Sequence, residues 1–320
     1  MPTHHPLRPR TWLGVLAALA LAAGSAGCGV ATTTNEADAA PTRTITDVTG
    51  TKVELPAVPN RVVALSEQDL DASLALGVKP VGTVNGRGQQ APPAYLGDKV
   101  AGIAIVGGVA KPTVDKVVEA APDVILAGGV ADPQILDQLR KVAPTVVTYK
   151  PDEDWKTAFK RQGEALGKDD KVTEVLAAYD TRVNEVKGRL GANATAEVSI
   201  VRWNPQGPGV MQTGQFASLV VSDLDLKRPA AQQEAGFSHG APVSLENLAR
   251  IDGEWLFLGT LNPQGSAALE KVRISPAFQQ LNAVRANRLI ATDGSLWTSR
   301  GGPLAAIGVL ADVEKALGAK

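Results

Sequence analysis

The sequence is poor in residues that form covalent cross-links and metal sites. Its 320 residues include one cysteine, Cys28, and three histidines. A single cysteine cannot form an internal disulfide, and tetrahedral metal sites need several sulfur or imidazole ligands. Two of the histidines, His4 and His5, lie close to the start, so the rest of the chain offers only His239. These shortages exclude a disulfide-stapled fold and a cluster of soft metal ligands supplied by the protein.

Sequence motifs of common catalytic sites are missing as well. The chain contains no Gly-x-Ser-x-Gly nucleophile elbow and no Gly-x-x-x-x-Gly-Lys phosphate loop. ALSEQD (64–69) follows the first expected buried strand, where a dinucleotide-binding fold would place Gly-x-Gly-x-x-Gly. A Ser–His–Asp arrangement would have to use His239. We therefore expect a protein that is not an enzyme.

An excess of one charge is also absent. The chain has 32 basic and 33 acidic residues. Proteins that bind nucleic acid usually carry a basic face and a high isoelectric point, so we expect no nucleic-acid partner. Aromatic residues make up 4% of the chain, and tryptophans in expected loops are therefore candidates for ligand contacts.

The N-terminus has the features of a secretory signal, residues 1–27. Two arginines precede a short apolar run, and small residues follow it up to Cys28. The stretch LAAGSAGC (21–28) resembles a bacterial lipobox, which implies cleavage before Cys28 and a diacylglyceryl thioether on its sulfur. Two acyl chains give stable membrane anchoring. Residues 28–43 are small and polar and predict a flexible lipidated tether on the extracytoplasmic face of the cell membrane.

Strands and helices alternate after the tether, which is typical of βαβ units with a mostly parallel sheet. We expect a hairpin over 44–55, an N-terminal lobe over 44–150 and a C-terminal lobe over 191–320. Apolar residues at helical spacing predict an interlobe helix within 151–190, roughly 50 Å long if unbroken. The stretch GKDD (167–170) is a candidate for a kink or a cap within it. The alternative is two ordinary helices inside one domain. The other expected strands are 61–65, 80–84, 103–108, 123–127, 145–149, 197–203, 255–258 and 288–292, and the other expected helices are 67–76, 113–120, 132–141, 215–223, 244–251, 266–282 and 301–317.

Two segments about 131 residues apart align without a gap, TVDKVVEAAPDVILAG (113–128) and SLENLARIDGEWLFLG (244–259). Each begins with a hydroxyl residue suited to a helix N-cap and has a carboxylate two positions later, Asp115 or Glu246. Such a carboxylate offsets the helix dipole by about 0.3–1 kcal/mol, which explains either acid alone. The other interpretation is that each lobe presents one exposed carboxylate to arginines of a partner.

Several segments together resemble class III solute-binding lipoproteins of ABC importers, of the ferric-siderophore and cobalamin type. The segments are VPNRVVALSEQDLDASLALGVKPVG (58–82), VGGVAKPTVDKVVEAAPDVILA (106–127), KVAPTV (141–146), VSLENLARIDGEWLF (243–257) and SPAFQQLNAVRANRLIATDGSLW (275–297). The resemblance implies an α/β fold of two Rossmann-like lobes with parallel-rich sheets, joined by a long interlobe α-helix. It implies a monomer that binds a small ligand between the lobes and docks on an ABC permease through Glu246 and the shorter Asp115. The protein would need no cofactor, because the chelate rather than the protein holds the iron.

Ligands of open parallel sheets bind beyond the carboxyl ends of the strands. The loops expected there offer several cationic and aromatic candidates: Arg87, Lys111, Arg202, Trp203, Trp297 and Arg300. For Arg202 and Trp203, strand alternation buries one side chain and leaves the other for the ligand. Hydroxamate binders of the family commonly use an arginine, a tryptophan and a tyrosine, which correspond here to Val109, Ser238 with Phe237 beside it, and Ser299. Phe237 is therefore a further ligand candidate.

Charge bears on the ligand class. Glu67 and Asp69 lie near the four cationic candidates, and this balance slightly favours a hydroxamate or mixed ferric siderophore over a tris-catecholate with about three negative charges. A haem ligand held by His239, or a cobalamin, is the alternative on the same fold. A cell-wall scaffold without a ligand is a third possibility.

Overall fold

The computed structural model describes residues 41–109 and 111–319. The predicted signal, the lipidation site Cys28 and most of the predicted tether lie outside the described residues. The first strand begins at Thr42. The last two residues of the predicted tether, 42 and 43, therefore belong to the folded part.

An antiparallel hairpin opens the folded part, as predicted. Its strands are β1 (Thr42–Thr46) and β2 (Lys52–Pro56). The Asp47 carboxylate accepts hydrogen bonds from the amides of Thr49 at 2.8 Å and Thr51 at 3.0 Å. Gly50 has a φ of 83°, a left-handed conformation that glycine adopts without strain.

The N-terminal lobe is built on a six-stranded sheet in the order β6-β5-β4-β3-β7-β8, in which only β6 is antiparallel to its neighbour. Its strands are β3 (Val62–Ala64), β4 (Gly82–Asn85), β5 (Ala104–Gly108), β6 (Lys111–Pro112), β7 (Val124–Leu126) and β8 (Thr145–Val146). Its helices are α1 (Glu67–Ala75), the 3₁₀ helix η1 (Ala94–Val100), α2 (Val114–Glu119) and α3 (Pro133–Arg140).

The C-terminal lobe has a four-stranded sheet in the order β10-β9-β11-β12, with β10 antiparallel. Its strands are β9 (Val198–Asn204), β10 (Gly207–Val210), β11 (Trp255–Thr260) and β12 (Leu289–Asp293). Its helices are η2 (Gly191–Asn193), α6 (Phe216–Asp223), η3 (Ala230–Gln232), η4 (Leu245–Ile251), α7 (Pro263–Arg273), α8 (Pro276–Gln279), α9 (Asn282–Arg285), α10 (Gly294–Trp297) and α11 (Pro303–Leu317). Two parallel-rich sheets, one in each lobe, confirm the predicted α/β fold.

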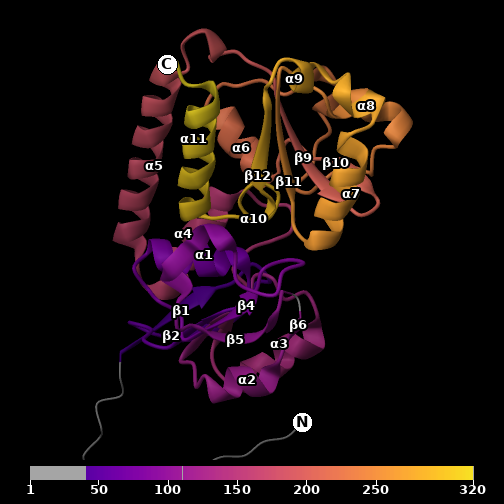
Figure 1. Ribbon diagram of the computed structural model, residues 1–320. Helices are drawn as coiled ribbons and strands as arrows, with labels where there is room; N and C mark the ends of the chain where they lie inside the picture. Colours follow the sequence, from indigo (N-terminus) through magenta and orange to yellow (C-terminus); the bar gives the residue numbers. More distant parts are fainter. Residues whose placement is uncertain (1–40, 110, 320) are drawn as a thin grey trace, which may run out of the picture. The chain divides into compact units, whose positions relative to one another are not determined.

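The segment between the sheets differs in one respect from the single interlobe helix of the prediction. It folds as two helices, α4 (Trp155–Leu166) and α5 (Asp169–Arg189), because Gly167 ends α4 in a left-handed conformation. A side chain at this glycine would meet the Ala57 carbonyl oxygen at 2.8 Å. Helix α4 contacts α1 of the N-terminal lobe, and the 21-residue α5 lies beside α11 of the C-terminal lobe (Figure 1).

The aligned segments of the sequence occupy equivalent places in the two sheets. Strand β7 runs parallel to β3, and β11 runs parallel to β9. The acid before each strand accepts a hydrogen bond from the backbone that starts the neighbouring strand: Asp123 from the amide of Arg61 at 3.0 Å, and Glu254 from that of Glu197 at 3.4 Å. The structure therefore supports the two-lobe repeat read from the sequence.

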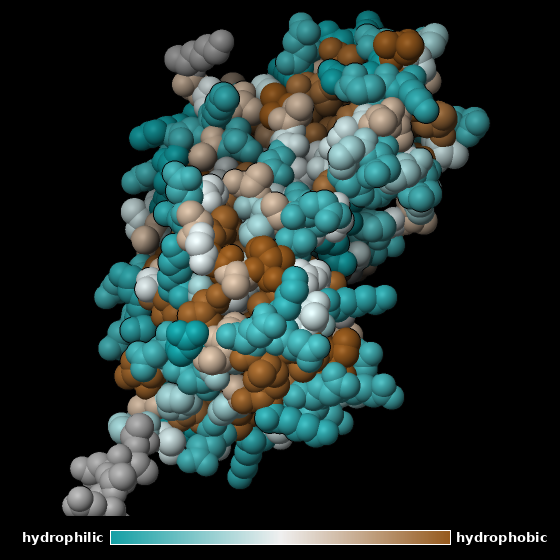
Figure 2. Space-filling view, turned by 60° about the horizontal axis from the view of Figure 1, so that its bottom comes forward, coloured by the Kyte–Doolittle hydropathy of each residue, from teal (hydrophilic) through white to brown (hydrophobic). Residues whose placement is uncertain are grey.

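Hydrophilic side chains cover most of the face shown in Figure 2, and hydrophobic ones form smaller groups among them. Within residues 41–109 and 111–319, no helix has the length and apolar character needed to cross a bilayer.

Candidate functional site

A cavity of about 550 Å³ collects residues from both lobes. The loops that follow β3, β4, β7 and β8 contribute from the N-terminal lobe, and β9, the 214–239 region and the 298–300 loop contribute from the C-terminal lobe. This is the position expected beyond the carboxyl ends of parallel strands. The lining residues with functional groups or rings are Gln68, Arg87, Tyr149, Asp152, Glu153, Trp155, Arg202, Gln215, Phe216, Phe237, Ser238, His239, Thr298, Ser299 and Arg300.

Three arginines that line the cavity have no carboxylate partner among the described residues. They are Arg87, Arg202 and Arg300, all predicted ligand residues. Arg202 projects from β9, and its Nε donates a hydrogen bond to Thr298 Oγ1 at 3.2 Å. Burial, and then the nearby charge of Arg87, lower the pKa of Arg202 to about 10. The group still carries its charge at neutral pH, so the wall is cationic.

Arg300 is held by groups that leave its charge uncompensated. Its Nη2 donates a hydrogen bond to the Pro151 carbonyl oxygen, and its guanidinium lies 5.2 Å from the centroid of the Tyr149 ring. A ring face attracts a cation without neutralising it. The side chain is thereby fixed while its remaining donors are available to a ligand.

Two acids, Asp152 and Glu153, line the cavity with the arginines, whereas Glu67 and Asp69 do not line it. Asp69 is fully buried and accepts hydrogen bonds from Ser66 Oγ, Thr148 Oγ1 and the Gln162 amide nitrogen. Burial raises the pKa of Asp69 above its ordinary value, and the hydrogen bonds only partly oppose this shift. Glu67 is buried and engaged by donors of the wall, and Glu153 pairs with Arg161 at 2.8 Å. Of the acids that the sequence placed near the ligand, neither Glu67 nor Asp69 lines the cavity, although the charge of Glu67 acts on Arg202.

Apolar rings cover another part of the wall. Trp155, at the start of α4, packs edge-to-face on Tyr179 with centroids 5.1 Å apart and on Phe216 at 6.1 Å. Phe237, a predicted ligand residue, is partly buried in the loop before η4 and lines the cavity. His239 lines it too, with Nδ1 3.0 Å from the Gly240 carbonyl oxygen. Ring faces and cationic donors therefore meet in one space.

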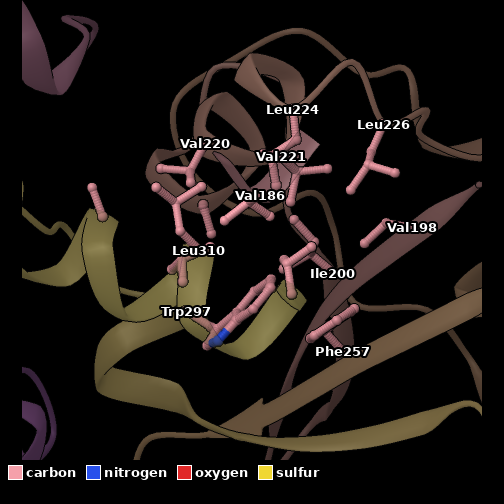
Figure 3. Packing of buried hydrophobic residues seen from close by; sticks show 14 of the residues in the cluster. Val186, Val198, Ile200, Val220, Val221, Leu224, Leu226, Phe257, Trp297 and Leu310 are labelled. Atoms are coloured by element: carbon pink, nitrogen blue, oxygen red, sulfur yellow. The ribbon is translucent and has the colours of Figure 1, made fainter. Parts of the chain in front are cut away.

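Two tryptophans predicted to line the cleft lie elsewhere. Trp203 is 1% exposed and packs edge-to-face on Phe278, with centroids 6.1 Å apart. Strand alternation explains this: Arg202 faces the cavity, and its neighbour on β9 faces the core. Trp297 is fully buried and stacks on Phe257 with centroids 4.3 Å apart (Figure 3). The prediction that these tryptophans line the cavity is wrong, because the sheet and α10 turn them into the core.

Lys111 also lies outside the cavity. It is exposed on the short strand β6, at the edge of the N-terminal sheet. The expected loop over 107–111 is partly strand, which turns this side chain away from the cavity wall.

Replacing Trp297 by phenylalanine tests its core role. The indole Nε1 donates a hydrogen bond to Asp312 Oδ2 at 2.8 Å, and the substitution would leave that carboxylate without this donor. We expect the free energy of unfolding to fall by about 1–3 kcal/mol, measured by urea denaturation, while ligand affinity stays unchanged. Weaker ligand binding with unchanged stability would instead make Trp297 a contact residue.

The two predicted docking acids are exposed, one in each lobe. Asp115 is in the first turn of α2, and Glu246 is in the first turn of η4. The expected helix over 244–251 is 3₁₀ rather than α, because Asn247 departs from helical geometry at φ −108°. Thr113 and Ser244 occupy the N-cap positions, but neither side chain makes a capping hydrogen bond. Neither acid belongs to an ion pair among the described residues.

Sequence reasoning missed some of the wall. The sequence predicts Tyr149 at the end of a strand and Trp155 in the interlobe helix, and both line the cavity. Both flank the 151–154 loop, which brings them to the cavity between the sheets. The scarcity of aromatic residues was the signal that could have singled them out.

A match to a family model covers residues 62–296, under the description "Periplasmic binding protein". This is well over half of the chain. The chain belongs to the periplasmic binding protein family. Its resemblance to class III solute-binding proteins of ABC importers is thereby confirmed, and members of this family are binding components of importers rather than enzymes.

Named relatives of this binding protein come from several bacteria. It is 32% identical over 290 residues to the "Probable siderophore-binding lipoprotein YfiY" of Bacillus subtilis strain 168, covering 88% of this chain and 89% of that one. It is 27% identical over 268 residues to the "Achromobactin-binding periplasmic protein" of Dickeya dadantii strain 3937, covering 82% of this chain and 87% of that one. The crystal structure of Staphylococcus aureus SirA complexed with staphyloferrin B matches with a TM-score of 0.74 at 25% identity, covering 86% of this chain and 98% of that one.

Proposed function

We propose that this binding protein captures a ferric siderophore in the cavity and delivers it to an ABC permease. The observation that carries the proposal is a set of three guanidiniums without a carboxylate partner among the described residues, which line one cavity together with aromatic rings. Guanidinium groups present several donors in a fixed plane and suit the oxygen atoms around a ferric centre. The printed name of one relative, the probable siderophore-binding lipoprotein YfiY, supports the assignment.

The charge of the wall favours an anionic chelate within this class. The slight preference for a hydroxamate or mixed chelate rests on the negative charges of Glu67 and Asp69, which would offset the positive charges of the arginines. Neither carboxylate lines the cavity, whereas all three arginines do, although the charge of Glu67 still acts on Arg202. A ferric carboxylate or catecholate complex would pair its negative charge with the arginines, and this pairing offsets the cost of desolvating them.

The proposal extends to location and delivery. A diacylglyceryl group on Cys28 would keep the protein at the extracytoplasmic face of the membrane, next to the permease. Asp115 and Glu246 would then contact arginines of the two permease subunits. In this proposal the chelate supplies all the ligands of the iron, so the protein needs no cofactor. The protein would act as a monomer.

A titration of intrinsic fluorescence tests the ligand class. Trp155 lines the cavity, and an iron complex bound there should quench its emission. We expect ferric citrate or a ferric tris-catecholate to bind at least ten times more tightly than a neutral ferric tris-hydroxamate. Tighter binding of the hydroxamate would overturn the preference for an anion. A response to cobalamin alone, or to none of these compounds, would overturn the siderophore assignment in favour of cobalamin or of a scaffold.

Haem is the second candidate, on one specific observation. His239 and Tyr149 line the same cavity, and both residue types can serve as axial ligands of haem iron. Haem binding would produce a shifted Soret band that disappears in the His239→Ala or Tyr149→Phe variant. An unshifted band in the wild-type protein would exclude this candidate.

A further inference from the structure

Helix α1 carries two buried carboxylates one turn apart, Glu67 and Asp71. Their exposed fractions are 4% and 0%. Residues at this spacing lie on one face of a helix. Neither side chain lines the cavity, and buried acids without a role are rare because their charge is costly to desolvate.

Glu67 joins a loop of each lobe. Its Oε1 accepts a hydrogen bond from the backbone amide of Arg87 at 2.7 Å, and its Oε2 accepts one from Ser299 Oγ at 2.6 Å. Arg87 belongs to the N-terminal lobe and Ser299 to the C-terminal lobe. One carboxylate therefore connects the two loops that carry Arg87 and Arg300.

Asp71 caps a helix of the other lobe. Its Oδ1 accepts from the amide of Leu304 and its Oδ2 from that of Ala305, both at 2.9 Å. These are first-turn amides of α11, which have no acceptor within their own helix. The N-cap residue is Gly302, which has no side chain to serve them, and a Cβ there would lie 2.6 Å from Asp71 Oδ1.

Another partner of Asp71 comes from its own lobe. Tyr95 OH donates to Oδ2 at 2.9 Å. Burial raises the pKa of Asp71 to about 6, while the hydrogen bonds from the α11 amides and Tyr95 lower it. The carboxylate is thus held between the lobes by donors from both.

We propose that Glu67 and Asp71 form an interlobe clasp that sets the position of Arg300 relative to Arg87 and so tunes ligand affinity without touching the ligand. The segment between Ser299 and Leu304 is held at both ends by α1, and Arg300 lies within it. Positioning of cationic donors before binding lowers the entropy cost of capture. The affinity part of this inference rests on the proposed function, whereas the clasp itself does not.

Amide hydrogen exchange tests the clasp without any ligand. In Asp71→Ala, we expect the amides of Leu304 and Ala305 to exchange at least ten times faster than in wild type. Gly302→Ala should have the same effect, because its Cβ displaces the carboxylate. The matched control is Asp69→Asn, which alters another buried acid of α1 whose side-chain partners all lie in the N-terminal lobe and α4. Unchanged exchange in both clasp variants, or equal acceleration in the control, would overturn the clasp.

A second measurement separates positioning from stability. Glu67→Gln keeps the shape of the side chain but loses the charge that holds two donors. We expect it to weaken binding of ferric citrate about tenfold while the melting temperature stays close to that of wild type. Faster exchange at the Arg87 amide with unchanged affinity would overturn the positioning role. If wild type binds no anionic chelate, the affinity part fails with the proposed function, and the exchange data still decide the clasp.

Discussion

Replacing Arg202 by glutamate is expected to weaken binding of an anionic ferric chelate at least 100-fold. The guanidinium lies largely buried on the cavity wall and has no carboxylate partner among the described residues. Removing one member of a desolvated charge pair costs about 2–5 kcal/mol, and a glutamate adds repulsion of the ligand. Each 1.4 kcal/mol corresponds to a factor of about ten in affinity, so the lower end of this range is a loss of about 30-fold, and the added repulsion brings the expected loss to at least about 100-fold. Isothermal titration calorimetry with ferric citrate measures it.

The matched control for this change is Arg285→Glu. Arg285 is exposed at the end of α9 and is not part of the cavity wall, and the substitution changes the net charge equally. We expect wild-type affinity from it. An equal loss in both variants would mean that the ligand responds to overall charge rather than to the cavity. Wild-type affinity of the Arg202 variant would remove the main support for an anionic ligand.

Reversing the charge of both docking acids, Asp115→Lys with Glu246→Lys, should abolish iron uptake and leave chelate affinity unchanged. Both side chains are exposed, one in each lobe, and neither lines the cavity. Opposite charges fix the register of an interface and like charges facing each other cost several kcal/mol, so two lysines would oppose arginines on the permease. Uptake of radioactive iron by cells that carry only the variant tests the first part, and fluorescence titration tests the second.

Glu119→Lys is the control for the docking surface. Glu119 is exposed on α2, one turn beyond Asp115, and changes the same helix by the same charge. Its uptake should stay near wild type. A parallel loss of affinity in the double variant would show that the acids support the fold or the cavity instead. The single Asp115 variant should have the smaller effect, because its side chain is one methylene shorter than that of Glu246.

Much of the fold followed from local patterns in the sequence. Short apolar runs between helical stretches predict buried parallel strands, and the expected strands over 61–65, 123–127 and 255–258 all coincide with observed ones. The break at Gly167 was less predictable, since a glycine inside a helical pattern can be tolerated or can end the helix. In the structure the Ala57 carbonyl oxygen leaves no room for a side chain at residue 167, and this contact joins segments far apart in the sequence.

The site was predictable only in part, for a related reason. The sequence places Arg87, Arg202 and Arg300 in loops and at strand ends beyond the sheets, and the structure brings all of them to one cavity. The sequence does not determine the direction of the Trp297 side chain. That direction depends on stacking against Phe257, which comes from β11. The sequence suggests that Glu67 lies beside the ligand. In the structure its carboxylate instead accepts hydrogen bonds from the Arg87 amide and Ser299 Oγ. Side-chain direction inside the wall therefore needs the tertiary structure.

The core beneath α11 has a consequence for dissecting the molecule. This apolar cluster combines Trp155 and Tyr179 of the connecting helices with strands and helices of the C-terminal lobe, and Tyr95 of the N-terminal lobe packs against it. A truncation at the boundary between the lobes would strip one side of that cluster and expose it to water. We therefore expect a C-terminal fragment without α4 and α5 to fold poorly and to be largely insoluble on expression.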